Sequence, residues 1–480
     1  MPVNPAWICR TFVLVGLLLD FAACGDDGNG GRPPQGPQTL AYALSQCTDG
    51  EAGATIRQAL DVRHGDAEPV VVAAFGPLNL PTTYGVCGVW GRTRTGGSSV
   101  QVFPIQRQGV SPDGSVVIFE VTDDFSLLAQ NWLPPDQEGI YVVHPDGKGL
   151  RRLGEASRAR AWAPWAGVNG AFFSVSPNGH QVVFTDLDAE APDPAVHQIW
   201  TLDVRTGERH QLTHLPRVPV PAGQLPVEYP GWLDNRTIAF AWWATNLDGT
   251  ESADVYTTFT VTTDPDDPQL SPIPVIALEP GTLIPNFSIT TPDPLVRALA
   301  IPGRTPVNGP GIYGDLVREA FLFDTDPSQV LQLTDYRRSD TSGRLTADGQ
   351  RVVVFASADP SGTNPAHNCE FFSMDRNAAD VRQLTHIGEG QNSNCDTYDG
   401  YGRGCTVSHM SIDPVTGWVT FESSCDPFGT NPYGFQVFTM RPDGTGLRQV
   451  TSARGMTLEP DGTVHVEMPG PFASPARGAL

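Results

Sequence analysis

The sequence is poor in basic residues and has a single lysine, Lys148. Lysine and arginine number 30 against 53 aspartate and glutamate residues, so the formal net charge is −23 at pH 7. A protein that binds nucleic acid neutralises phosphates with a basic surface. The charge therefore predicts no nucleic-acid partner, and we interpret the acidic surface as a source of solubility.

Long apolar runs and long amphipathic helices are also missing. The apolar run at residues 11–19, TFVLVGLLL, is too short to span a bilayer. The chain instead contains 50 glycines and 44 prolines among many short runs of β-branched residues. This composition predicts a turn-rich, all-β protein whose 480 residues suit one large β domain.

Common catalytic motifs are missing as well. The sequence has no G-x-S-x-G elbow, no H-E-x-x-H helix and no phosphate-binding glycine loop. His210 and His214 have i,i+4 spacing, but His386 occupies the position of His214 in another repeat, which indicates a structural role. His409, with Asp413 nearby, is the best isolated candidate for a binding site, because it precedes an innermost strand and could face a central channel. The sequence favours a protein that is not an enzyme.

The first 23 residues have the features of a signal peptide, with Arg10 ahead of the short apolar run. Residues 21–25, FAACG, resemble the lipobox of bacterial lipoproteins. The resemblance implies that Cys24 is diacylated and becomes the first mature residue, whereas an ordinary secretory signal is the alternative. Residues 24–38, rich in Gly, Pro and Asp, then form a flexible tether. We expect a lipid-anchored protein of the bacterial cell envelope, at the periplasmic face of a membrane or at the cell surface.

One phrase recurs along the rest of the chain. Residues 436–451, QVFTMRPDGTGLRQVT, read as a β-hairpin, with an apolar strand, a Pro-Asp-Gly turn and a returning strand. Similar phrases occupy residues 140–153, 199–213, 321–334 and 371–385. A second motif, such as Ser-Pro-Asp-Gly at residues 111–114, opens each unit with a tight turn before another strand; it recurs at 175–179, 232–235, 345–349 and 412–414.

Two hairpins per unit predict a four-stranded antiparallel sheet, and a series of such sheets predicts a β-propeller. We count six units, at residues 110–153, 174–213, 229–263, 287–334, 344–385 and 409–451. A seventh is possible if an N-terminal β-rich extension, residues 39–107, pairs with residues 458–467. The propeller then covers residues 108–468, and residues 469–480 form a disordered tail.

The repeated pattern, S-P-D-G-x-x-V-x-F followed by I-W-x-x-D-x-x-T-G-x-x-R-Q-L-T, resembles the TolB-type, PD40 class of WD40-like repeats. The resemblance covers about residues 110–451. It implies a β-propeller like that of the periplasmic protein TolB or of prolyl oligopeptidase-like enzymes. Propellers host unrelated activities, so for function it implies only a possible role as a periplasmic or outer-membrane scaffold.

The turns inside each hairpin are short, whereas the connections between hairpins and between blades are long. In a four-stranded blade both kinds of long connection emerge on the same face of the propeller. A rigid scaffold presents recognition loops in this way. We predict that this face binds a partner through aromatic and arginine side chains, namely Trp132, Trp162, Trp165, Arg158 and Arg160. The alternative is that the tryptophans cap the apolar interior.

Six cysteines remain after Cys9 and Cys24, an even number that predicts disulfides in an exported chain, and none has the spacing of a zinc site. We expect Cys47 to pair with Cys87. The other four should share the long-connection face, where we favour two pairs and leave the other pairings open: Cys369 with Cys425, and Cys395 with Cys405.

The loops at 359–365, DPSGTNP, and 426–432, DPFGTNP, repeat each other. Their Asp and Asn oxygens could bind calcium, but we favour side chains that bond their own backbone, and we expect no cofactor.

We predict a monomeric binding scaffold with an envelope protein or glycan as its partner. The alternative is a propeller lyase or hydrolase that acts on a polysaccharide or peptide at the channel mouth. A metal-dependent lyase would need His409 to meet His64, His367 or His386.

Overall fold

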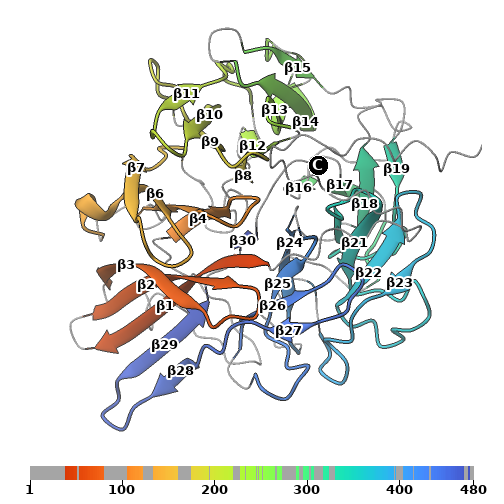
Figure 1. Ribbon diagram of the computed structural model, residues 1–480. Helices are drawn as coiled ribbons and strands as arrows, with labels where there is room; N and C mark the ends of the chain where they lie inside the picture. The colour runs from red at the N-terminus through yellow and green to blue at the C-terminus, as the bar shows by residue number, and fades with distance from the viewer. Residues whose placement is uncertain are drawn as a thin grey trace, which may run out of the picture. The chain divides into compact units, whose positions relative to one another are not determined.

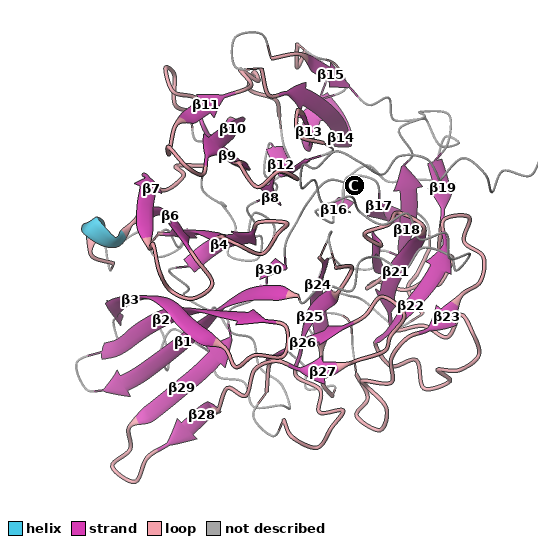
Figure 2. Cartoon of the chain, viewed as in Figure 1, coloured by secondary structure: helices cyan, strands magenta, loops and turns pink. Residues whose placement is uncertain are grey.

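The computed structural model contains β-strands almost throughout. It describes residues 38–50, 53–80, 105–122, 133–159, 174–193, 195–219, 227–232, 234–244, 246, 248–250, 252–264, 268–272, 288–290, 296–301, 304–307, 317–323, 330–393, 395, 404–413, 416–431, 434–469 and 474–475. Figure 2 shows strands joined by loops in these residues, and Pro135–Gln137 form a short 3-10 turn. No helix in this part of the chain is long and apolar enough to cross a membrane.

Six four-stranded antiparallel sheets form the blades of a β-propeller, as the repeats predict. Blade one consists of β4 (Ile105–Val110), β5 (Val117–Val121), β6 (Gly139–Val143) and β7 (Arg151–Gly154). Blade two consists of β8 (Ser174–Val175), β9 (Gln181–Leu187), β10 (His197–Asp203) and β11 (Arg209–Gln211). Blade three consists of β12 (Val227–Trp232), β13 (Thr237–Ala244), β14 (Ser252–Thr262) and β15 (Leu270–Pro272). Blade four consists of β16 (Ser288–Thr290), β17 (Val296–Ile301), β18 (Val317–Phe323) and β19 (Val330–Gln332). Blade five consists of β20 (Ser342–Leu345), β21 (Arg351–Ala356), β22 (Glu370–Asp375) and β23 (Arg382–Gln383). Blade six consists of β24 (Val407–Ile412), β25 (Val419–Ser423), β26 (Gln436–Met440) and β27 (Arg448–Gln449).

A seventh sheet, here called the terminal sheet, joins the two ends of the described chain (Figure 1). Its strand order is β28-β29-β1-β2-β3, from β1 (Thr39–Gly50), β2 (Gly53–His64), β3 (Val70–Leu80), β28 (Gly455–Leu458) and β29 (Val464–Pro469). The pairing of the extension with residues 458–467, the condition for a seventh unit, is therefore present. Two residues of the predicted disordered tail, Ser474–Pro475 (β30), also pair with β1, so this part of the tail is ordered.

The terminal sheet packs between blades one and six. On one side, its apolar side chains share a core with β4, β5 and β6, where Phe75 packs edge-on against Phe119 and Tyr141. On the other side, Leu40 and Tyr42 pack against Val437 of β26. The extension is thus part of the propeller's packing and not a separate appendage.

Apolar faces of neighbouring blades pack against each other, because the middle strands are buried on both sides. All five residues of β5, β25 and β26 are buried, the polar side chains of these strands included. Phe371, Phe421 and Phe438 form one such layer between blades five and six. Burying a side chain of this size stabilises the fold by roughly 1.5–3 kcal/mol.

Turns and long connections lie at opposite ends of the blades. The strands of a blade are consecutive and antiparallel. The turns after the first and third strands therefore share one end, which we call the short-turn face. The connections after the second and fourth strands share the other end, which we call the long-loop face.

The recurring Gln-Leu-Thr phrase forms a buried hydrogen-bond unit at the long-loop end of the third and fourth strands, here called the threonine clip. In blade five, the hydroxyl of Thr385 accepts a hydrogen bond from Phe371 N at 2.9 Å and donates one to Glu370 Oε2 at 2.7 Å. Equivalent threonines in blades two, four and six make the same two bonds with Ile199 and Gln198, with Ala320 and Glu319, and with Val437 and Gln436. The repeated sequence thus reflects architecture.

Candidate functional site

The two disulfides between described cysteines join the chain on the long-loop face of blades five and six. Cys369 is bonded to Cys395, and Cys405 is bonded to Cys425. The predicted pairs, Cys369 with Cys425 and Cys395 with Cys405, are wrong. Cys405 comes two residues before β24 and therefore lies beside the loop of its own blade, whereas Cys395 stays with blade five.

These disulfides brace the connection between the two blades at both ends. Cys369 ends the 357–369 loop of blade five and Cys425 begins the 424–435 loop of blade six, while Cys395 and Cys405 belong to the connection that starts at residue 384. We call the described residues of these three segments the braced loop surface.

Hydrogen bonds hold the first part of the connection against blade five. Glu370 is 1% exposed, and its carboxylate accepts bonds from Ile387 N at 2.8 Å and Gly388 N at 2.9 Å. Burial raises the pKa of this carboxyl, against the opposing effect of these hydrogen bonds. Ser393 Oγ accepts a bond from Cys369 N at 2.8 Å. The connection is therefore fixed to the blade before its first disulfide.

A further bond ties the connection to blade six. Gln391 Oε1 accepts a hydrogen bond from Asp426 N at 2.8 Å, across 35 residues of sequence. Asp426 in turn uses Oδ1 to accept bonds from Thr430 N and Asn431 N, at 2.7 and 2.8 Å. The connection and the 424–435 loop thus form one hydrogen-bonded structure.

The two repeated loops have the backbone-bonding arrangement that the sequence favours. Asp359 Oδ1 accepts a bond from Asn364 N at 2.7 Å, as Asp426 does from Asn431 N. Asn364 Nδ2 donates to two carbonyls, and Asn431 Nδ2 does the same in blade six. These oxygens hold their own loops in shape.

The tips of these loops are open to solvent. Gly362 and Gly429 have φ values of 72° and 68°, and neither would bring an added Cβ within 4 Å of another atom. Phe428 is 46% exposed at its tip, one of few large apolar side chains exposed among the described residues. Phe428 stands between Pro427 and Gly429. An exposed aromatic side chain on a hydrogen-bonded loop is suited to contacting a partner surface.

Buried charges extend this structure toward blade four. Asp340 Oδ1 lies 3.4 Å from Ser357 N, and Ser357 Oγ lies 3.4 Å from Cys395 N. Burial raises the pKa of Asp340, while the hydrogen bond from Ser357 and the nearby charges of Arg338 and Arg318 oppose it. The first disulfide thus lies against a polar junction between two blades.

Most of the residues that the sequence proposed for binding lie outside the described residues, namely Trp132, Trp162, Trp165 and Arg160. Arg158 is exposed on the long-loop side of blade two, where its N–H bonds Asp186 Oδ1 at 2.7 Å. Cys24 and Cys87 are also outside the described residues, and Cys47 is disulfide-bonded. The backbone of His409 lies within β24, the first strand of blade six, and not ahead of that strand as the sequence suggested.

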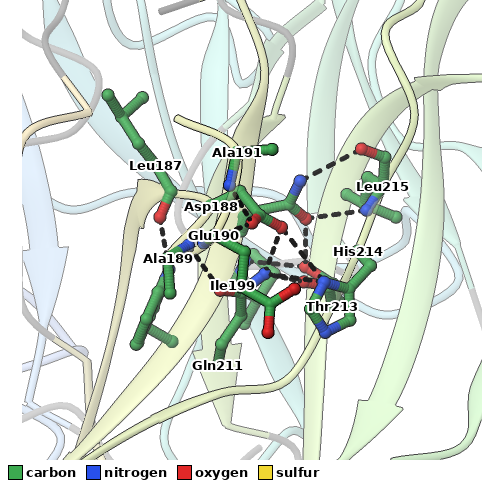
Figure 3. A network of polar contacts seen from close by, with 12 residues as sticks. Leu187, Asp188, Ala189, Glu190, Ala191, Ile199, Gln211, Thr213, His214 and Leu215 are labelled. Carbon is green, nitrogen blue, oxygen red and sulfur yellow. Dashed lines mark hydrogen bonds and ion pairs between the residues drawn. The ribbon is translucent and has the colours of Figure 1, made fainter. Parts of the chain in front are cut away.

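Of the two histidines singled out by their spacing, His214 belongs to a hydrogen-bond network, whereas His210 Nε2 lies 3.6 Å from Glu208 Oε1. In Figure 3 the Asp188 carboxylate lies between Gln211 and His214, with His214 Nδ1 at 3.0 Å and Gln211 Nε2 at 2.7 Å from Oδ2. Bonds from Ala191, Gln211, Glu190 and His214 outweigh the effect of burial and lower the pKa of Asp188 to about 2. His386 stands in the equivalent place beside Gln383, at 3.3 Å. These contacts indicate a structural role.

A metal-dependent lyase would need His409 to meet another histidine, and the side chain of His409 lies outside the described residues. His64 is in the terminal sheet, where it bonds Thr39, whereas His367 and His386 are in blade five. Across the part of the chain that the structure describes, no three His, Cys, Asp or Glu residues are arranged to hold a metal.

The fold defines the protein as a β-propeller whose ends meet in one sheet. No family model and no curated protein matches the chain. Solved structures similar to it include an oligogalacturonate lyase from Vibrio parahaemolyticus, with 10% identity, a TM-score of 0.46 and coverage of 84% of this chain and 96% of that one. Others are the β-propeller domain of the Trilobed protease from Pyrococcus furiosus (11%, 0.41, 77% and 88%) and TolB from Acinetobacter baumannii (13%, 0.31, 91% and 67%). At these identities the similarities concern fold alone.

Proposed function

We propose that this protein is an extracytoplasmic, lipid-anchored scaffold that binds an envelope protein or polymer through the braced loop surface. The observation that carries the proposal is the pair of disulfides, Cys369–Cys395 and Cys405–Cys425, which tie one connection to loops of both neighbouring blades. Disulfides persist in oxidising compartments outside the cytoplasm, which supports the location.

Bracing favours binding because it reduces the entropy that a loop loses when a partner orders it. A loop fixed in advance by covalent and hydrogen bonds has less conformational freedom to lose on association. The threonine clip of Glu370, the Asp359 and Asp426 loops and the disulfides all act in this direction on one surface. Phe428, exposed at its rim, supplies an apolar anchor.

The test is photo-crosslinking in the native cell envelope. A photo-reactive amino acid replaces Phe428 or Ser361 on the long-loop face, or Asn377 in the short turn of blade five as a matched control. We expect the first two positions to crosslink to the same partner, which then binds the purified protein, and the control to yield none. Crosslinking to that partner from Asn377 alone, or to none from any position, would contradict the proposal.

Lipid anchoring has its own test, because binding does not require it. Cys24→Ser removes the predicted acylation site, so we expect the protein to move from the membrane fraction to the soluble fraction. Retention of the variant in membranes, with no change in lipid labelling, would contradict the anchor while leaving the binding surface in place.

A further inference from the structure

The folded chain starts at the short-turn face. Gln38 is 3% exposed, and its side-chain amide donates to Thr420 Oγ1 and accepts from Thr439 Oγ1, both at 2.8 Å. Thr420 is the second residue of β25, directly after a short turn, and Thr439 is the last but one of β26, directly before the next short turn. Gln38 is thus fixed at the short-turn end of blade six.

Contacts with blade one and with the terminal sheet give the same location. Gln38 O accepts a bond from Gly65 N at 2.6 Å, and Gly65 O accepts one from Arg448 Nη2 at 3.1 Å, next to the last turn of blade six. Gly114, in the first short turn of blade one, is so close to Thr39 that an added Cβ would lie 2.4 Å from its Oγ1. The start of β1 therefore lies among the short turns of both neighbouring blades.

The braced loop surface lies at the other end of the same two strands. β25 runs from beside Gln38 to Ser423, which is two residues before the disulfide-bonded Cys425, and β26 begins at Gln436 in the threonine clip. Cys425 comes five positions after Thr420, so at about 3.3 Å per residue the disulfide lies roughly 17 Å along the chain direction from the Gln38 contact with Thr420.

We infer that the anchor holds the short-turn face toward the membrane, so that the braced loop surface faces away from it and takes a partner that does not lie in the same bilayer. The inference rests on the proposed lipid anchoring at Cys24. A Gly/Pro-rich stretch of 14 residues would, as a flexible coil, have a root-mean-square length of about 20 Å, comparable with the roughly 17 Å from Thr420 to Cys425, so we expect the face beside Gln38 to lie nearer the anchor.

The short turns carry exposed charges of both signs. Asp113 and Asp146 are exposed there, and Asp146 Oδ2 lies 2.9 Å from Lys148 Nζ, while Arg205 and Arg382 are exposed in other short turns or directly after them. The orientation therefore rests on the position of Gln38 and not on attraction or repulsion at the lipid surface.

Energy transfer from the lipidated full chain to vesicles tests the orientation. A donor dye is placed on Ser361→Cys or on Asn377→Cys, which are exposed at opposite ends of blade five, and the phosphatidylethanolamine and phosphatidylglycerol vesicles carry acceptor lipid. We expect a larger loss of donor emission at Asn377 than at Ser361. A Gly/Ser insertion in the tether should reduce the difference.

The outcomes separate the inference from the function on which it rests. Vesicle-bound protein with equal or greater loss at Ser361 overturns the orientation and leaves the anchor intact. Wild-type protein that does not associate with the vesicles, and behaves like Cys24→Ser, overturns the anchor and the orientation together. The binding role of the braced loop surface is decided independently by crosslinking.

Discussion

The two faces of the propeller are stabilised in different ways. Inside the repeated short turns, bonds span a few residues: Ser111 Oγ donates to Asp113, and Thr346 Oγ1 donates to Asp348. On the long-loop face of blades five and six, disulfides span 26 and 20 residues, and the Gln391–Asp426 bond spans 35. Local sequence determines the shape of each short turn, whereas the assembled fold determines the shape of the braced loop surface. The loops of that surface are therefore free to vary while their shape remains fixed.

Among the changes considered for the two faces, removing one disulfide should lower the free energy of unfolding most. For Cys369→Ser with Cys395→Ser, loss of a 26-residue cross-link is expected to lower the free energy of unfolding by about 3–4 kcal/mol. Denaturant titration measures this loss, and hydrogen exchange should rise in the 357–369 loop but not in the turn at 376–380. Equal increases at both ends of blade five would show that the two faces are not independent.

The terminal sheet adds a pH dependence that neither face supplies. Asp61 is 7% exposed, its Oδ1 has no hydrogen-bond partner, and it pairs across the strands with Tyr42. Burial first, and then the charge of Glu467, raise its pKa from 3.8 to about 6. The folded state thus favours the protonated acid, so this contribution to stability is complete below about pH 4 and is lost as the pH rises through 6.

The loss between about pH 4 and pH 7 is expected to reach roughly 3 kcal/mol, because one pKa unit corresponds to about 1.4 kcal/mol. Urea titrations across this pH range measure the loss. In Asp61→Asn, the free energy of unfolding should no longer fall by this amount as the pH rises. A variant that keeps the full loss would place the pH dependence elsewhere.

The threonine clips allow a matched exchange on the long-loop face. Glu319 and Glu370 use both oxygens to accept backbone N–H bonds, whereas Gln198 and Gln436 accept one and use Nε2 to donate to a carbonyl. Glu370→Gln would turn an N–H toward Gly388 N, and Gln436→Glu would turn a carboxylate toward Ala453 O. Each should cost about 2 kcal/mol in unfolding free energy. Neutral results for both would show that the clips tolerate either side chain.

The smallest effect should come from a single turn. Thr346→Val removes the bond to Asp348 Oδ1 at 2.6 Å and the bond from Arg351 N at 3.0 Å. We expect a loss of about 1 kcal/mol in unfolding free energy, with unchanged protection of the braced loop surface. A loss as large as that of a disulfide, measured by the same titration, would remove the contrast between the faces.

The same contrast explains how much the sequence predicts. The Pro-Asp-Gly turns and the Gln-Leu-Thr phrases predict the six blades because each unit repeats a local hydrogen-bond pattern. β1 lacks the repeated motif, and its partner β29 comes more than 400 residues later, so only the possibility of that pairing could be stated. Pairing across such a distance depends on the whole assembly.

At the candidate site, the sequence predicts which cysteines meet on one face but not their partners. The pairing depends on where the connection runs. Glu370 fixes Ile387 and Gly388 to blade five, which keeps Cys395 with Cys369, and the short step from Cys405 to β24 leaves it beside Cys425. The amino-acid sequence shows that the two loops repeat each other, but the exposure of Phe428 is seen only in the folded structure. The proposed tryptophans stay predictions.

The most direct test of the central claim is the affinity of the crosslinked partner for the purified protein. It is compared for wild type, for Cys369→Ser with Cys395→Ser, and for Asn377→Ala as the short-turn control. If bracing prepares the loops for binding, the disulfide variant should bind at least about tenfold more weakly, a loss of about 1.4 kcal/mol, while the control matches wild type. Equal affinity in all three folded proteins would contradict the claim that bracing prepares this surface for binding.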